Sequence, residues 1–461
     1  MRLLIECTHV YEHPELNSGI QRVVRNVVEE LACMTNPVEC VAVMMCDGRL
    51  YRVNSLAPMR AAPDAALKRR VMLSLDRACD QIIFLLVRVK RVAQLVRSPL
   101  KRKILALPAV LSTVMIKLLM RGRTWAGRLA SVQLRSEPLT VRPRDHLVLL
   151  DSSWHADFLP MVGEIKAAGA GIVAVVYDLI PLTHALYCND RHSAVFASWF
   201  DWVARTADGF MAISKTISDQ VATEIERRLG AEEAARRWHG HFHLGSELDQ
   251  ARHGGRPSAE VRELFRSAAP TYLMVSTIEP RKNHAYLLDA FERLWAQGSP
   301  ARLCIIGRIG WKCDDLIARI RRHPELSRRL FMINDANDAS LEHAYSHARA
   351  LVFPSHVEGF GLPLVEAMQR GLPAFASDIP VFREIGGDFI SYFDLANPAS
   401  LAERIAGFES SGQFPAARSL QDWHWIGWRE ASLQLVEGVC QGIERAHAAA
   451  ALAAPADARR T

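Results

Sequence analysis

Short runs of apolar residues alternate with longer stretches in which apolar residues recur at helical spacing, in both halves of the chain. The runs predict buried strands and the stretches predict amphipathic helices. In the first half the predicted strands are Arg2–Glu6, Val38–Met45, His146–Leu150, Gly171–Tyr177 and Gly209–Ile213, and the predicted helices are Ser18–Ala32, Trp154–Ala168, Arg191–Arg205 and Ser214–Leu229. This alternation is typical of a parallel sheet covered by helices on both faces.

The second half repeats the pattern. Its predicted strands are Tyr272–Ser276, Arg302–Ile306, Leu330–Ile333, Ala350–Phe353, Pro373–Ala376 and Phe389–Phe393, and its predicted helices are His284–Ala296, Ser340–Ala348 and Pro363–Arg370. The fold class is therefore α/β, with two doubly wound, Rossmann-like domains that we expect to face each other across a cleft.

The length of 461 residues also favours two domains over one core. A stretch rich in glycine and proline, residues 245–258, is the predicted linker. We expect the domains at 1–250 and 259–420, a C-terminal helix that crosses back to the first domain at 421–447, and a disordered tail at 448–461.

A basic segment, residues 65–136, interrupts the first domain. It holds 16 Lys and Arg residues and two acidic residues, which gives it a local charge of +14. Because the net charge of the chain is +6, the other residues together carry a charge of −8. Apolar and basic residues alternate in it at helical spacing, which favours amphipathic helices on an anionic membrane surface. A helical insertion with a solvated basic face is the alternative. Few aromatic residues accompany the charges, which argues against a nucleic-acid partner.

The remaining bulk features favour a cytoplasmic protein, peripheral on the inner face of the cell membrane. The run after Met1 ends at Glu6, too early for a signal peptide. The longest uncharged run of the basic segment, 104–116, is too short to span a bilayer. Nine cysteines occur without paired spacing, which favours a reducing compartment and no structural zinc.

The stretch 352–366, VFPSHVEGFGLPLVE, carries the most information about chemistry. A strand ends at Phe353, glycines follow, and Pro363 stands where a helix can begin. Free N–H groups at such a helix start bind anions, and glycine permits close approach of a diphosphate. Glu358 and Glu366 would then accept hydrogen bonds from sugar or ribose hydroxyls.

On these residues the chain resembles family 4 of the retaining glycosyltransferases, which have the two-domain GT-B fold. Glu358 and Glu366 match the family's two glutamates, separated by seven residues with Gly-Phe-Gly between them. The resemblance implies that Glu358 contacts the donor sugar and Glu366 holds the nucleotide ribose. It also implies backbone donors to the phosphate or sugar, namely Gly359, Phe360, Gly361 and Leu362.

A second match is the stretch 275–283, VSTIEPRKN, which follows a predicted strand. Lys282 corresponds to the phosphate-binding lysine of the family, and adjacent cations would compensate the charge of a leaving diphosphate. Many members carry an arginine earlier in this motif, where Ser276 or Thr277 stands here. Arg281 either replaces that cation or faces solvent.

Matches in the first half are weaker. Gly19 corresponds to a glycine that touches the donor in relatives, and Arg22 is a candidate for the acceptor side. Asp178 and His184 follow another strand and are acceptor-side candidates, although Asp178 is equally suited to forming a turn before Pro181. Ser214 fits a strand-to-helix turn of the family and is also a plausible N-cap.

No DxD string stands at a strand end, so we expect no metal and no cofactor. The predicted function is retaining transfer of a hexose or deoxyhexose, mannose first, from a nucleotide diphosphate-sugar to a lipid-linked oligosaccharide or polysaccharide. Lys282, Arg281, Glu358 and Asp178 are the candidate catalytic residues, and in relatives the donor's own phosphate accepts the proton. The alternatives are a non-catalytic GT-B assembly subunit at the membrane, or a GT-B epimerase or disaccharide synthase.

Overall fold

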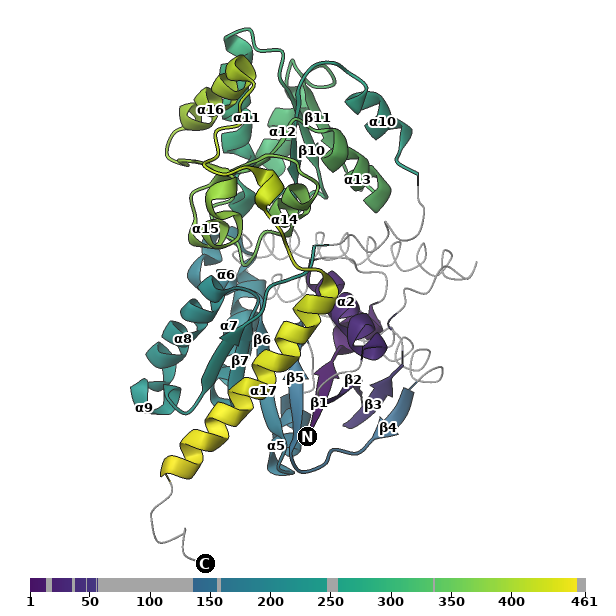
Figure 1. Cartoon of the computed structure of the whole chain (residues 1–461), viewed down its shortest axis with the longest axis vertical. Coiled ribbons are helices and arrows are strands. Elements are labelled where there is room, and N and C mark those ends of the chain that lie inside the picture. Colours follow the sequence, from purple (N-terminus) through teal and green to yellow (C-terminus); the bar gives the residue numbers. More distant parts are fainter. Residues whose placement is uncertain are drawn as a thin grey trace, which may run out of the picture.

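The computed structural model describes residues 1–13, 19–34, 38–46, 48–54, 56, 136–155, 159–246, 256–334 and 336–453. They form two domains stacked along the long axis of the molecule, each with its own sheet (Figure 1). The α/β class predicted from the sequence is confirmed. The basic segment lies outside the described residues except for Ser136, which belongs to a strand.

The N-terminal sheet has the strand order β4-β3-β2-β1-β5-β6-β7-β8. Strands β2, β1, β5, β6, β7 and β8 run parallel, and β3 and β4 add an antiparallel edge. The strands are β1 Arg2–Glu6, β2 Glu39–Cys46, β3 Arg49–Val53, β4 Ser136–Leu139, β5 Asp145–Leu149, β6 Gly171–Val176, β7 Gly209–Ala212 and β8 Trp238–His241. The helices are α1 Thr8–Glu12, α2 Gly19–Cys33, α5 Leu159–Ala167, α6 Ile180–Thr183, α7 Asp190–Thr206, α8 Lys215–Leu229 and α9 Ala231–Ala234.

The C-terminal sheet is parallel throughout, in the order β11-β10-β9-β12-β13-β14. Its strands are β9 Thr271–Val275, β10 Arg302–Ile306, β11 Leu330–Ile333, β12 Ala350–Phe353, β13 Ala374–Ser377 and β14 Ser391–Phe393. Its helices are α10 Ala259–Phe265, α11 His284–Ala296, α12 Asp314–Arg322, α13 Asp338–His347, α14 Leu362–Gln369, α15 Pro380–Gly386 and α16 Pro398–Ser411.

Helix α17, Trp428–Ala453, returns from the C-terminal domain and lies along the N-terminal one (Figure 1). Gly438 and Gly442 let it approach Met211 and Trp238, because a Cβ on either glycine would overlap those side chains. The helix thereby covers β7 and β8 and ties the end of the chain to its first sheet.

Sequence patterns located the strands of the C-terminal sheet and the buried central strands of the N-terminal sheet, but missed three strands near the edges of the N-terminal sheet. Strands β3, β4 and β8 carry polar residues and are partly exposed, so they lack an apolar run. The helix predicted over Trp154–Ala168 is confirmed for Leu159–Ala167, which is α5, but its start is wrong because Trp154 and His155 belong to a 3-10 turn, Ser153–His155.

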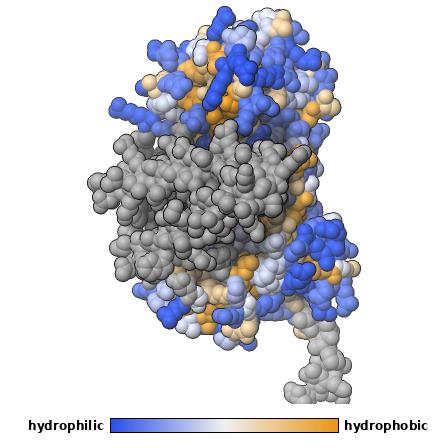
Figure 2. Space-filling view, turned by 180° about the vertical axis from the view of Figure 1, so that it is seen from behind, coloured by the Kyte–Doolittle hydropathy of each residue, from blue (hydrophilic) through white to orange (hydrophobic). Residues whose placement is uncertain are grey.

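No helix among the described residues is long and apolar enough to cross a membrane. On the face opposite to that of Figure 1, hydrophobic residues in the coloured part of the surface lie in separate patches among hydrophilic ones (Figure 2).

Candidate functional site

The predicted donor residues of the C-terminal domain meet at the point where its strand order reverses. Lys282 lies in the loop after β9, and Glu358 lies in the loop after β12. These strands are neighbours in the sheet but are followed by connections that lead in opposite directions. In doubly wound sheets the crevice at such a switch point is where ligands bind. The topology therefore explains why residues 76 positions apart are in contact.

Glu358 is the centre of an ion cluster. Its Oε1 accepts a hydrogen bond from Lys282 Nζ, and its Oε2 accepts one from Arg281 Nη1 at 2.8 Å. Arg281 also pairs with Glu279, Nε to Oε1 at 2.6 Å. Because the Arg281 side chain is only 21% exposed and makes both contacts, it does not simply face solvent.

Burial and charge act against each other in this cluster. Burial alone would raise the pKa of Glu358, but the charges of Arg281 and Lys282 outweigh it and lower that pKa to about 2. Burial lowers the pKa of Lys282, and the neighbouring Arg281 charge adds to this effect. Glu358 is therefore an ionised hydrogen-bond acceptor at neutral pH and is unsuited to act as a general acid.

The glycine loop, residues 354–361, leads from β12 into α14. Gly361 precedes the helix with φ of 101°, and Pro363 lies in the first turn. Gly359 lies against the other domain: a Cβ there would be 2.3 Å from the carbonyl oxygen of Tyr177. Both positions thus require glycine, one for its backbone angle and one for space.

The first turns of α2 and α14 face each other across the domain boundary. A Cβ on Gly19 would lie 3.9 Å from the Leu362 side chain. Arg22, a candidate for the acceptor side, binds the carboxylate of Glu366, whose other oxygen accepts a hydrogen bond from Tyr345 at 2.7 Å. Two helix N-termini aimed at one region can stabilise a bound anion from both sides.

The predicted acceptor residues lie on the N-terminal side of the same region. Asp178 forms the turn before Pro181, since its Oδ1 accepts a hydrogen bond from the backbone N–H of Ile180 at 3.0 Å. Burial raises its pKa while the nearby Arg281 charge opposes this, so the carboxyl also borders the ion cluster. His184 belongs to a ladder of rings in which Tyr187 stacks on both His184 and His356, at 6.2 and 5.3 Å.

The other predicted residues are placed less directly. Ser276 Oγ lies 3.3 Å from His284 Nε2, and Thr277 is exposed beside Gly310. Phe360 is buried with its ring against His243 and Trp425, so only its backbone is available to a ligand. Leu362 packs into the core as the first residue of α14. Ser18 lies outside the described residues.

Sequence reasoning missed Glu279 and a pair of buried acids. Glu279 is 2% exposed, and its Oε2 has no hydrogen-bond partner among the residues that are described. Glu6 is the last residue of β1 and Asp151 lies two residues after β5, and the N-terminal strand order reverses between these strands. They accept backbone N–H groups, including Thr8 to Glu6 at 2.7 Å and Val10 to Asp151 at 2.6 Å. An acidic residue at the carboxyl end of a buried apolar run was the available signal.

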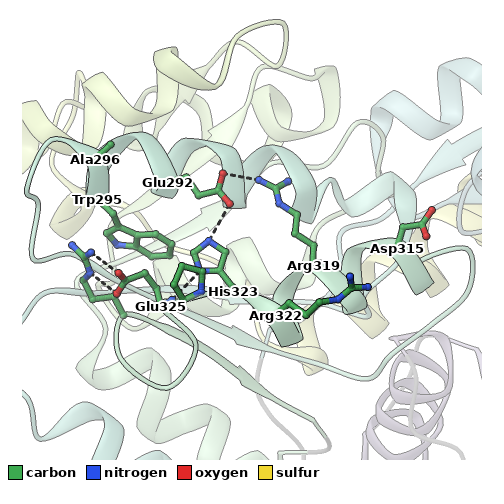
Figure 3. A pocket seen from close by; sticks show the side chains of 10 residues that line it. Glu292, Trp295, Ala296, Asp315, Arg319, Arg322, His323 and Glu325 are labelled. Atoms are coloured by element: carbon green, nitrogen blue, oxygen red, sulfur yellow. Dashed lines mark hydrogen bonds and ion pairs between the residues drawn. The ribbon is translucent and has the colours of Figure 1, made fainter.

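A separate cavity of about 770 Å³ lies between α11, α12 and the start of β11 (Figure 3). Glu292 points toward Arg319 and His323 there, at 2.8 and 3.0 Å, and Arg329 pairs with Glu325. The cavity opens at the amino end of β11, the opposite edge of the sheet from the glycine loop. It is not the site predicted from the sequence.

The family model of glycosyl transferases group 1 matches residues 256–421. The C-terminal domain is therefore similar to group 1 glycosyl transferases over its whole length. The matched residues include both stretches from which the donor site was predicted, Glu279–Lys282 and Glu358–Glu366.

Similarity to several mannosyltransferases extends beyond the residues that the family model matches. The chain is 32% identical over 308 residues to the serotype-specific mannosyltransferase WbdA of Escherichia coli, covering 66% of this chain and 38% of WbdA. It is 27% identical over 225 residues to a phosphatidyl-myo-inositol mannosyltransferase of Mycolicibacterium smegmatis, covering 46% and 56%. The chain thus spans about two fifths of the length of the WbdA relatives.

Two solved structures show the fold. A sucrose-phosphate synthase of Thermosynechococcus elongatus aligns over 98% of this chain and 100% of its own, with a TM-score of 0.51 and 16% identity. The HepE protein of Anabaena, solved with UDP-glucose, aligns over 98% and 99%, with a TM-score of 0.50 and 12% identity. The predicted GT-B architecture around the glycosyl transferase domain is confirmed.

Proposed function

We propose that the chain is a retaining glycosyltransferase. It transfers a hexose or deoxyhexose, mannose first, from a nucleotide diphosphate-sugar to a lipid-linked or surface polysaccharide. The observation that carries the proposal is the meeting of Arg281, Lys282 and Glu358 with the start of α14, at the switch point of a group 1 glycosyl transferase domain. The names of the mannosyltransferase relatives support the choice of mannose.

The residues supply what transfer from a nucleotide sugar requires. A leaving diphosphate gains negative charge as the glycosidic bond breaks, and preorganised donors that meet this charge lower the barrier. Lys282, Arg281 and the N–H groups at the start of α14 are such donors, so a divalent metal is not needed in this proposal. Ionised Glu358 accepts a hydrogen bond from a sugar hydroxyl. Glu366 accepts a hydrogen bond from a ribose hydroxyl, which replaces one of its contacts with Arg22 and Tyr345.

A thermal-shift panel of nucleotide sugars tests the proposal, because a ligand that binds the native state raises its apparent stability. We expect GDP-mannose at 100 times its Kd to stabilise the wild type by ~2.7 kcal/mol. Glu366→Ala and Lys282→Ala should lose that increment, whereas Glu403→Ala, at an exposed position of α16, should keep it. A wild type that neither binds nor turns over any nucleotide sugar in the panel contradicts the proposal.

Membrane association through residues 65–136 completes the proposal and rests on their charge of +14. Each Lys or Arg near an anionic bilayer contributes ~1 kcal/mol of attraction. Replacing Lys101, Arg102 and Lys103 by Gln should therefore weaken co-sedimentation with phosphatidylserine vesicles, with no change for neutral phosphatidylcholine vesicles. Equal sedimentation of both proteins with anionic vesicles would remove the membrane from the proposal.

A further inference from the structure

Helix α8 of the N-terminal domain begins against the glycine loop. Ser214 caps this helix, since its Oγ accepts the N–H of Ile217 at 3.2 Å. The same hydroxyl donates to the carbonyl oxygen of Gly359 at 3.0 Å. Ser214 is fully buried, so water does not compete for either bond. One hydroxyl group thereby links a helix start of one domain to the backbone beside Glu358 in the other.

Glu384 of α15 makes a second link to the same helix start. Its Oε1 accepts the N–H of Lys215 at 2.7 Å, and its Oε2 accepts the N–H of Thr216 at 2.8 Å and the Thr216 hydroxyl at 2.6 Å. The first N–H groups of a helix lack partners within it, and its dipole favours a negative charge there. A carboxylate from one domain therefore completes a helix of the other.

The two chain crossings between the domains meet at this place as well. His243 Nε2 lies 3.0 Å from Glu384 Oε1, and the His243 ring packs against Phe360 and Trp425. Trp425 donates its indole N–H to the carbonyl oxygen of Leu244 at 2.8 Å. The side chain of Phe360, the middle residue of the Gly-Phe-Gly string, is thus anchored where the chain passes between the domains.

From these contacts we infer that Ser214 and Glu384 are positioning residues for the proposed transfer, holding the glycine loop against α8 so that Glu358 stays between Arg281 and Lys282. Neither residue touches the ion cluster in its own right. Ser214 acts through Gly359, which adjoins Glu358 and approaches the Tyr177 backbone too closely for any other residue. Glu384 acts through the start of α8, the helix that Ser214 caps. The inference rests on the proposed function for its catalytic part.

Kinetics of four variants with GDP-mannose test the inference. We expect Ser214→Ala and Glu384→Ala to lower kcat/KM by ~10-fold to 100-fold, since small misplacements of positioned groups cost that much. Glu384→Gln should recover part of the loss because its amide oxygen still accepts a hydrogen bond. Ser258→Ala is the matched control: Ser258 caps α10 through the N–H of Val261 at 3.2 Å and contacts only its own domain in that role. It should stay within about twofold of wild type.

A second control and a second readout separate the possible failures. Asp378→Ala breaks an exposed ion pair with Arg383 of α15 and leaves the Glu384 contacts intact, so it should retain wild-type kinetics. Wild-type kcat/KM in folded Ser214→Ala and Glu384→Ala overturns the inference. If the wild type uses no nucleotide sugar, the proposed function fails, and small-angle scattering then tests whether Glu384 holds the two domains together. Glu384→Ala should show a larger radius of gyration than Asp378→Ala. Equal radii overturn the inference.

Discussion

At the scale of single residues, the site is a balance between buried charges. Glu358 lies between two cations that belong to a loop 76 residues earlier, and each of the three groups would be costly to bury alone. In the proposed function a diphosphate enters this balance as a further anion, beside the carboxylates of Glu358 and Glu279. The cations would then be shared between Glu358 and the phosphate oxygens.

The pKa of Glu358 gives a prediction for stability. Its value of about 2 is lower than in the unfolded chain, so the ionised group stabilises the fold above the ordinary glutamate range near ~4.3 and loses this contribution as the pH falls toward 2. We expect Glu358→Gln to lower the free energy of unfolding by ~3–5 kcal/mol at pH 7, as for other broken buried pairs. Denaturant titrations of both proteins at pH 7 and pH 3 should show a smaller difference at pH 3. A difference that does not change with pH would contradict the assignment.

At the scale of elements, α14 illustrates how a loop and a helix share one function. Gly361 turns the chain with a positive φ so that the helix starts at Leu362, and Gly371, with φ of 70°, follows the other end. Both ends need glycine for the backbone angle. Only Gly361 is also crowded, since a Cβ would lie 2.7 Å from the Phe382 ring, whereas nothing surrounds a Cβ on Gly371.

These two glycines form a matched pair for mutation. Gly371→Ala should cost ~1–2 kcal/mol of stability, the usual penalty of a left-handed residue with a Cβ. Gly361→Ala should cost more, because the new methyl group also displaces Phe382, and it should abolish the thermal shift with GDP-mannose. Thermal unfolding of both variants with and without the nucleotide sugar measures the two effects. Equal destabilisation, with donor binding intact in both, would rule out this account of the loop.

At the scale of the whole molecule, the two domains are joined by side chains and by the returning helix. Trp425 and His243 pack where the chain crosses, and α17 then lies on β7 and β8 of the first sheet. The close approach of α17 depends on Gly442, since a Cβ there would be 2.3 Å from the Trp238 ring. Helix α17, the last element among the described residues, therefore belongs structurally to the first domain.

Substitution of Gly442 tests this dependence. Gly442→Ala should lower the unfolding temperature because α17 must move away from Trp238 or displace its ring. Gly407→Ala in α16 is the control: a Cβ there meets nothing within 4 Å, so alanine should stabilise by ~0.5–1 kcal/mol through its helix propensity. Calorimetric scans of the two variants should shift in opposite directions. A stabilising Gly442→Ala would show that α17 is not held in this way.

The local parts of this protein can be predicted from the order of its residues alone. Strands such as Arg302–Ile306 and Ala350–Phe353 were predicted to the residue because they are buried on both faces and therefore apolar throughout. The string from Glu358 to Glu366 predicted its loop and helix because glycine and proline act within a few residues of the chain.

Which groups come into contact depends on the packing of the whole chain. The contacts of Arg22 with Glu366, of Glu384 with the start of α8 and of Ser214 with Gly359 join residues more than a hundred positions apart. Such pairs arise from strand order and domain packing, which leave no periodic signal in either partner. The missed strands of the N-terminal sheet, β3, β4 and β8, were hidden for a related reason: their residues are partly exposed, so burial does not impose an apolar pattern on them.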